Sequence, residues 1–81
     1  MPYIKKALRD RAYGLYTPAE NAGILNYMLT SVIKTYLDSK GLSYQTCNDI
    51  VGALDNAKDE FKRRIQNPYE DKKIQENGDV Y

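Results

Sequence analysis

Residues 24–37 read ILNYMLTSVIKTYL, and their apolar pattern is typical of an all-α protein. Its apolar residues fall in pairs spaced four apart, which lays a wide apolar stripe along one face of a helix. The pairs are Ile24-Leu25, Met28-Leu29, Val32-Ile33 and Tyr36-Leu37. A helix with such a stripe needs a partner surface, so the stretch predicts an α-helix that packs against another helix.

Local signals on both sides predict where this helix begins and ends. Thr17-Pro18-Ala19-Glu20 matches a capping box, with a hydroxyl acceptor, Pro at the first helical position and Glu three residues on. Gly41 follows Lys40 and precedes Leu42. That pattern is typical of a helix that ends on a left-handed Gly, with the next apolar residue folded back over the last turn.

A second apolar repeat follows Ser43 and predicts a second helix. Its members recur at intervals of three or four: Tyr44, Cys47, Ile50, Val51, Leu54, Ala57, Phe61 and Ile65. The opposite face is charged, and Glu60 and Arg64 are spaced for an i,i+4 ion pair. The residue before Pro68 disfavours helical geometry, so the second helix should end near Gln66.

The C-terminal residues predict a short third helix. Asn67-Pro68-Tyr69-Glu70 repeats the capping pattern, which places this helix from Pro68 to about Glu76. Asn77-Gly78 should stop it and leave Asp79-Val80-Tyr81 as an extended tail.

Together these elements predict one all-α domain over residues 1–81. It comprises an N-terminal arm or short helix over 1–16, an antiparallel two-helix hairpin over 17–66, and a short helix and tail over 67–81. The turn at 41–43 is short, and two helices of about 22 residues would each run about 33 Å. One hairpin covers only one side of each stripe, so we expect oligomerisation to complete the fold, with a dimer as the simplest closed form.

Composition excludes several function classes. The 81 residues include 12 basic and 11 acidic side chains and no His. Without His there is no Ser-His-Asp triad and no ordinary His-based zinc site, so we expect no enzyme, no metal and no cofactor. A net charge of +1 gives no field for long nucleic acid. No apolar run reaches the roughly 18 residues of a membrane span and no secretory signal is visible, so we expect a cytoplasmic protein.

The remaining reactive side chains have structural interpretations. Cys47 lies within the apolar repeat of the second helix, which favours a buried small hydrophobe over a nucleophile. The carboxylates Asp55, Asp59 and Glu60 are expected on a solvated helix face. Gly52 falls inside the second helix, where close helix packing is the favoured explanation.

Aromatic and basic residues coincide at the ends of the chain, which holds eight Tyr. Tyr supplies rigid contact area that can stack on nucleobases, and Lys or Arg can bind phosphate. The candidates for ligand binding are Arg63 and Arg64 for phosphate, Lys72 and Lys73 as secondary cations, and Tyr69 and Tyr81 for stacking. The alternative is a solvated basic rim around a protein interface.

The stretch 68–81, PYEDKKIQENGDVY, resembles the C-terminal signature of a family of short uncharacterised proteins of bacteriophages and prophages. Further matching segments are residues 1–5, 25–27, 36–37, 41–44, 48–49 and 57–64. The similarity spans nearly the whole chain and is weakest over residues 6–20. The resemblance implies a phage or prophage accessory protein.

Two functions remain open on these grounds. In the first, a homo-oligomer sequesters a small anionic nucleotide signal at sites between subunits, as an anti-defence protein. In the second, the chain is an inhibitor or adaptor that binds a host or phage protein through its apolar flank and its terminal Tyr residues.

Overall fold

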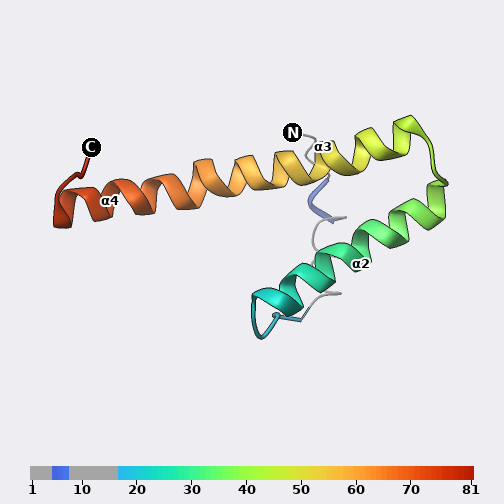
Figure 1. The fold of residues 1–81 in the computed structure, drawn as a ribbon, viewed down its shortest axis with the longest axis horizontal. Coiled ribbons are helices and arrows are strands. Elements are labelled where there is room, and N and C mark those ends of the chain that lie inside the picture. The colour runs from blue at the N-terminus through green and yellow to red at the C-terminus, as the bar shows by residue number, and fades with distance from the viewer. Residues whose placement is uncertain (1–4, 8–16) are drawn as a thin grey trace. The chain divides into compact units, whose positions relative to one another are not determined.

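The computed structural model describes residues 5–7 and 17–81, and the described chain is helical with no strand (Figure 1). Its elements are α2 (Ala22–Lys40), α3 (Tyr44–Phe61), the π-helix η1 (Lys62–Gln66) and α4 (Asn67–Asn77). The predicted all-α class is confirmed for these residues. The predicted arm or helix over 1–16 lies, apart from residues 5–7, outside them. The chain divides between Cys47 and Asn48 into two compact units.

The start of α2 differs from the prediction. The helix begins at Ala22, and Asn21 is its N-cap with extended backbone at φ −157°. The Asn21 side chain accepts a hydrogen bond from the backbone N–H of Ile24 at 2.9 Å. Thr17 and Pro18 lie outside the helix, so the predicted capping box is wrong. Asn is at least as good an N-cap as Thr, and the cap that lies nearer the apolar repeat prevails here.

The end of α2 follows the prediction for the backbone of Gly41 but not the prediction for the side chain of Leu42. Gly41 has a positive φ of 83° and donates its N–H to the carbonyl of Leu37 at 2.8 Å. Only glycine adopts such a φ without strain, so it ends the helix. Leu42 is 83% exposed, so it does not fold back over the last turn.

Helix α3 begins where the sequence predicts, directly after Ser43. The Ser43 hydroxyl accepts a hydrogen bond from the backbone N–H of Thr46 at 3.1 Å and donates to the Thr46 hydroxyl, also at 3.1 Å. This satisfies one of the free N–H groups of the first turn. Further along α3, Cys47 is exposed, so the expected buried thiol is wrong for this chain taken alone.

The predicted break before Pro68 is also wrong, because the backbone stays helical from Tyr44 to Asn77. Proline lacks an N–H and its ring crowds the carbonyl four residues back. The π-helix η1 precedes this position, and the N–H of Asn67 reaches the carbonyl of Lys62, five residues earlier. The wider turn holds one additional residue and carries the helix through Pro68. Asn67 is therefore helical, at φ −64° and ψ −46°, and is not a cap.

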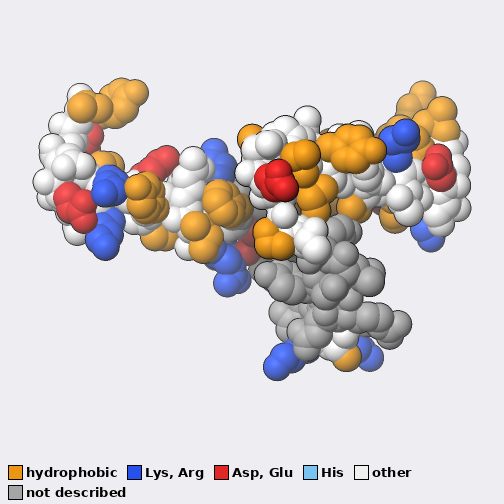
Figure 2. Space-filling model, turned by 90° about the horizontal axis from the view of Figure 1, so that it is seen from below, with side chains coloured by type: hydrophobic (Ala, Val, Ile, Leu, Met, Phe, Trp, Pro, Cys, Tyr) orange, Lys and Arg blue, Asp and Glu red, His pale blue; other side chains and the backbone are white. Residues whose placement is uncertain are grey.

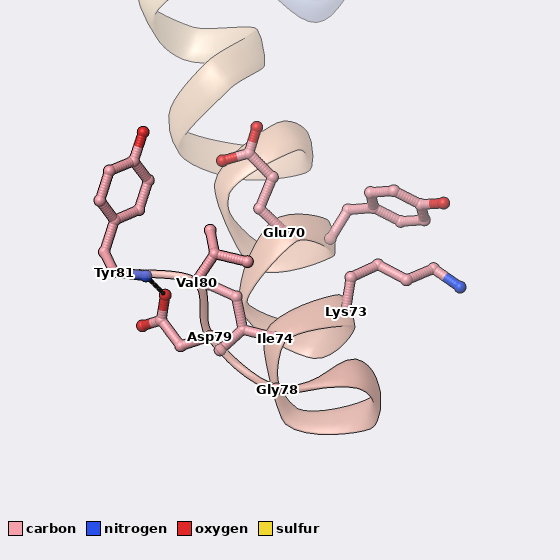
Figure 3. A pocket seen from close by; sticks show the side chains of 8 residues that line it. Glu70, Lys73, Ile74, Gly78, Asp79, Val80 and Tyr81 are labelled. Atoms are coloured by element: carbon pink, nitrogen blue, oxygen red, sulfur yellow. Dashed lines mark hydrogen bonds between the residues drawn. The ribbon is translucent and has the colours of Figure 1, made fainter.

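Helix α4 ends as the sequence predicts. Gly78 has a positive φ of 86°, and its N–H donates to the carbonyl of Ile74 at 2.8 Å. Residues 78–81 are not helical. Their backbone runs beside α4 (Figure 3), and within the tail the N–H of Tyr81 donates to Asp79 Oδ1 at 2.8 Å.

The described residues bury no hydrophobic side chain, and their one buried side chain is that of Thr46. Figure 2 shows hydrophobic side chains, in orange, at the surface over the helices. Exposed fractions such as 52% at Leu25 and 59% at Phe61 mean that much apolar surface remains in contact with water. Within the described ranges, no helix is both long and apolar enough to cross a membrane.

Candidate functional site

All six candidate ligand-binding residues lie in the second unit. The π-helix η1 carries Arg63 and Arg64, α4 carries Tyr69, Lys72 and Lys73, and the tail carries Tyr81. The structure divides them into two groups. One surrounds Glu60 and the other surrounds the C-terminal tail.

Glu60 holds both arginines of η1. Arg63 Nη2 lies 2.9 Å from Glu60 Oε1 and 3.2 Å from Oε2, while Arg64 Nε lies 2.6 Å from Glu60 Oε2. The predicted pairing of Glu60 with Arg64 is confirmed, and Arg63 joins it at i,i+3 spacing. Glu60 is the more enclosed partner, at 21% exposure, against 66% and 61% for the two arginines. Each guanidinium thus keeps an open side toward solvent, while its charge is partly compensated by the shared carboxylate.

Lys73 has two neighbours on α4. Its Nζ lies 5.6 Å from the centre of the Tyr69 ring and 3.3 Å from Glu76 Oε2. The first contact is a cation–π arrangement between residues four apart, and the second is an exposed ion pair of the kind that contributes about 0–1 kcal/mol. The Lys73 charge is therefore already shared between an aromatic face and a carboxylate.

The tail and α4 border an open surface hollow of about 310 Å³, which we call the tail hollow. Its lining consists of Tyr69, Glu70, Lys73, Ile74, Gly78, Asp79, Val80 and Tyr81. In Figure 3, Val80 lies beside Ile74. Tyr81 and Lys73 lie on opposite sides of the helix in the same view. Three of the six candidates, Tyr69, Lys73 and Tyr81, line the tail hollow.

The charges of the tail hollow do not suit an anion. Glu70 and Asp79 each contribute a carboxylate, and Lys73, the one basic side chain of its lining, is paired with Glu76. Phosphate groups are bound where cations or backbone N–H groups gather. Lys72 lies outside this lining and is exposed. The structure therefore separates the aromatic candidates from the arginines that were expected to bind phosphate.

The π-helix creates an arrangement that the sequence patterns alone do not predict. Phe61, Ile65 and Tyr69 follow one another at four-residue spacing. In an α-helix, the eight residues from Phe61 to Tyr69 would turn the side chain about 80° off line, since 3.6 residues complete a turn. The π-turn uses one additional residue for the same rotation about the helix axis, so the rotation from Phe61 to Tyr69 is about 100° smaller. Tyr69 therefore returns close to the line of Phe61. We call these three exposed side chains the apolar row.

The signal for the apolar row is present in the sequence. Three apolar residues at strict four-residue spacing, with Pro68 just before the third, are compatible with a helix that widens at the proline as well as with one that stops there. The row could have been found by asking how a helix accommodates this proline.

Among the described residues no group of three His, Cys, Asp or Glu side chains is arranged to hold a metal ion.

Comparison with known proteins places the chain in a family. A family model described as "Domain of unknown function (DUF6899)" matches residues 1–80. The chain belongs to this family. The match covers the whole apolar row and five of the six candidates, and it stops one residue before Tyr81. No curated protein and no solved structure matches this DUF6899 chain.

Proposed function

We propose that this chain is a non-enzymatic phage or prophage protein that self-associates through its helices and acts by occupying the surface of another protein. The single observation that carries this proposal is the exposure of the apolar side chains: 42% of the residues are hydrophobic, yet the described chain buries none of them. Burial of apolar surface is the main favourable term in folding. A chain with this surface gains stability when another polypeptide covers it.

Within this proposal the two long helices form the antiparallel hairpin that the sequence predicts. Helix α2 has 19 residues and α3 has 18, so they match in length across the short turn at 41–43. Each would offer its apolar stripe to the other. The hairpin leaves a flank of each stripe open, and copies of the chain cover it in a homo-oligomer in the host cytoplasm.

The tail is the part of the chain best suited to a partner protein. Val80 is 92% exposed and Tyr81 is fully exposed, beside the apolar side chain of Ile74. Tyr and apolar anchors that enter a partner's pocket carry most of the binding energy of many interfaces. We place the contact with the host or phage protein here, in the manner of an inhibitor or adaptor.

Site-specific photocrosslinking tests this proposal. A benzophenone amino acid replaces Tyr81 in one variant and Gln75, which does not line the tail hollow, in a matched control. In cells of the host, the variant at 81 should give one reproducible heterologous adduct that the variant at 75 does not give. Addition of the partner identified in the adduct should then yield a complex with purified protein. Adducts that are equal at both positions, or purely self-adducts, would refute a tail-mediated function.

A second candidate function, sequestration of a small anionic nucleotide, is favoured by one specific observation. Lys62, Arg63 and Arg64 are consecutive on η1, and both arginines share one carboxylate, Glu60. With three cations and one carboxylate, this cluster keeps an excess of positive charge. The carboxylates in the tail hollow weigh against the aromatic half of such a site, which is why this function ranks second.

Native mass spectrometry on a panel of cyclic and linear nucleotides separates the two candidates. Nucleotide sequestration requires a bound mass that disappears on unfolding, and Arg64→Ala should abolish it while helicity and oligomer size stay unchanged. Under the protein-binding proposal the same panel gives no adduct. Loss of helicity in Arg64→Ala would place this arginine in a structural ion pair with Glu60.

A further inference from the structure

The helix from Tyr44 to Asn77 is too long for α2 to cover. At about 1.5 Å per residue it runs about 50 Å, whereas the 19 residues of α2 span about 28 Å. Even in a complete hairpin, α2 ends near the start of η1. The apolar row then lies at and beyond the edge of what α2 can reach. Its side chains are 59%, 58% and 61% exposed at Phe61, Ile65 and Tyr69.

Charges of opposite sign lie beside the two ends of the apolar row. Lys62 directly follows Phe61, and Glu70 directly follows Tyr69. The turn that brings Tyr69 into line with Phe61 therefore brings Glu70 onto the same edge as Lys62. Within the described part of the chain, neither Lys62 nor Glu70 has an ion pair, in contrast to Arg63, Arg64 and Lys73. The two are about 12 Å apart along the helix, so they cannot pair within one chain.

We propose that η1 and α4 pair in antiparallel orientation with the same segment of a second copy of this chain. The two-fold axis lies near Gln66 and Asn67. It sets Ile65 against Tyr69 of the partner subunit, and it sets Lys62 against Glu70 of the partner subunit. The same contacts then occur twice, as a two-fold interface requires. The proposal rests on the self-association proposed above and assigns it a segment, an orientation and two ion pairs.

The other edge of the row is compatible with this alignment. Arg64 lies there, and it would approach Lys72 of the partner subunit. The ion pair with Glu60 at 2.6 Å compensates the charge of Arg64 within its own chain. The shared carboxylate thus weakens the repulsion between Arg64 and Lys72 of the partner subunit that would oppose the pairing. Lys62 and Glu70 are left for the intermolecular contact.

The area of the row sets the strength of the dimer. Aromatic side chains carry about 150–250 Å² each, so three large side chains about 60% exposed offer roughly 300 Å² per copy. Aliphatic stems of the flanking Lys and Arg side chains add to this. The total surface buried by the two copies is then about 600–1,000 Å², which is smaller than the area of a standard stable interface. We therefore expect a reversible dimer whose fraction depends on protein concentration.

Charge reversal tests the alignment with a matched control. Glu70→Lys and Asp71→Lys make the same charge change at neighbouring positions, but Asp71 lies away from the row. Sedimentation equilibrium at low salt, over a range of protein concentrations, should show a dimer dissociation constant raised about tenfold by Glu70→Lys and by Lys62→Glu. Asp71→Lys should change it less than about twofold, since an exposed charge off the interface contributes little.

The double variant Lys62→Glu/Glu70→Lys decides the proposal. Exchange of the two charges restores both intermolecular pairs, so its dissociation constant should return to within about twofold of the unmodified chain. Lys62→Glu/Asp71→Lys should show no such recovery. A dimer insensitive to these charges, or a double variant as weak as the summed single variants, would overturn this alignment while leaving self-association intact. A chain that is monomeric at every concentration would overturn both this inference and the proposed self-association.

Discussion

The backbone N–H of Asn67 donates to the carbonyl of Lys62, five residues earlier, and this bond carries the helix through Pro68. Without it, the proline would interrupt the helix at the point where the sequence predicts a break. The wider turn also realigns Tyr69 with Phe61, so one local adjustment determines both the length of the helix and the continuity of its apolar surface.

Pro68→Ala tests whether the proline maintains the π-turn. Alanine restores a backbone N–H and removes the ring, so η1 can relax to α-helical geometry. We expect greater helix stability together with weaker self-association, because Tyr69 turns away from the row. Hydrogen exchange at residues 62–70 and sedimentation equilibrium measure the two effects. Stronger protection with an unchanged dimer would contradict the alignment role of the π-turn.

Asn21→Ala tests the observed N-cap of α2. The Asn21 side chain accepts the Ile24 N–H at 2.9 Å, and loss of such a cap costs about 1 kcal/mol, within a range of 0.5–2. Urea denaturation followed by circular dichroism measures the change. Thr17→Ala is the matched control and should leave stability unchanged. A larger loss for Thr17→Ala would restore the capping box that the sequence predicts.

Two glycines should respond to alanine in opposite directions. Gly52 lies in α3, and a Cβ built there meets no atom within 4 Å, so Gly52→Ala should stabilise the chain by up to about 1 kcal/mol. Gly41 has a φ of 83° and a ψ of 156°, a backbone region open almost only to glycine, so Gly41→Ala should destabilise the chain by about 1–3 kcal/mol. Thermal unfolding of both variants checks the contrast. Loss of stability at Gly52 would instead support the close helix packing that the sequence suggests.

Glu60→Gln tests the arginine cluster on η1. The substitution removes the carboxylate that holds Arg63 and Arg64, and for exposed pairs we expect a loss of about 0.5–1 kcal/mol. The freed Arg64 should also repel Lys72 of the partner subunit and weaken the dimer. Sedimentation equilibrium in low and high salt tests this, because salt screening should recover the dimer. A salt-independent loss would point to a packing role for Glu60.

Much of the fold follows from local sequence. Ser43, Gly41 and Gly78 mark helix boundaries through their own hydrogen bonds or backbone angles, so short-range rules predict those boundaries correctly. Two boundaries are predicted wrongly, the start of α2 and the helix end expected before Pro68. At each of them, two local structures compete. Asn21 and Thr17 are both good N-caps, and Pro68 can either end a helix or widen it. Local preference does not decide between such alternatives, because packing and the neighbouring turns contribute to the outcome.

The site was predictable only in part. The pairing of Glu60 with Arg64 follows from spacing, since residues four apart on a helix are neighbours. The separation of Tyr69 and Tyr81 from the arginines does not follow from spacing. It depends on the extra residue in η1 and on the direction in which the tail leaves Gly78. Residues close together in sequence thus end in two different surroundings.

Disulfide pairing in a mixture of two variants tests the antiparallel pairing of η1 and α4 between two copies of the chain. Both carry Cys47→Ser; one also carries Ile65→Cys with an affinity tag, and the other carries Tyr69→Cys without a tag. Mild oxidation of the mixture should join position 65 of one chain to position 69 of the other, in excess over either homodimer. Predominant homodimers of the Ile65→Cys variant, or no disulfide at concentrations where the unmodified chain sediments as a dimer, would contradict the antiparallel assembly.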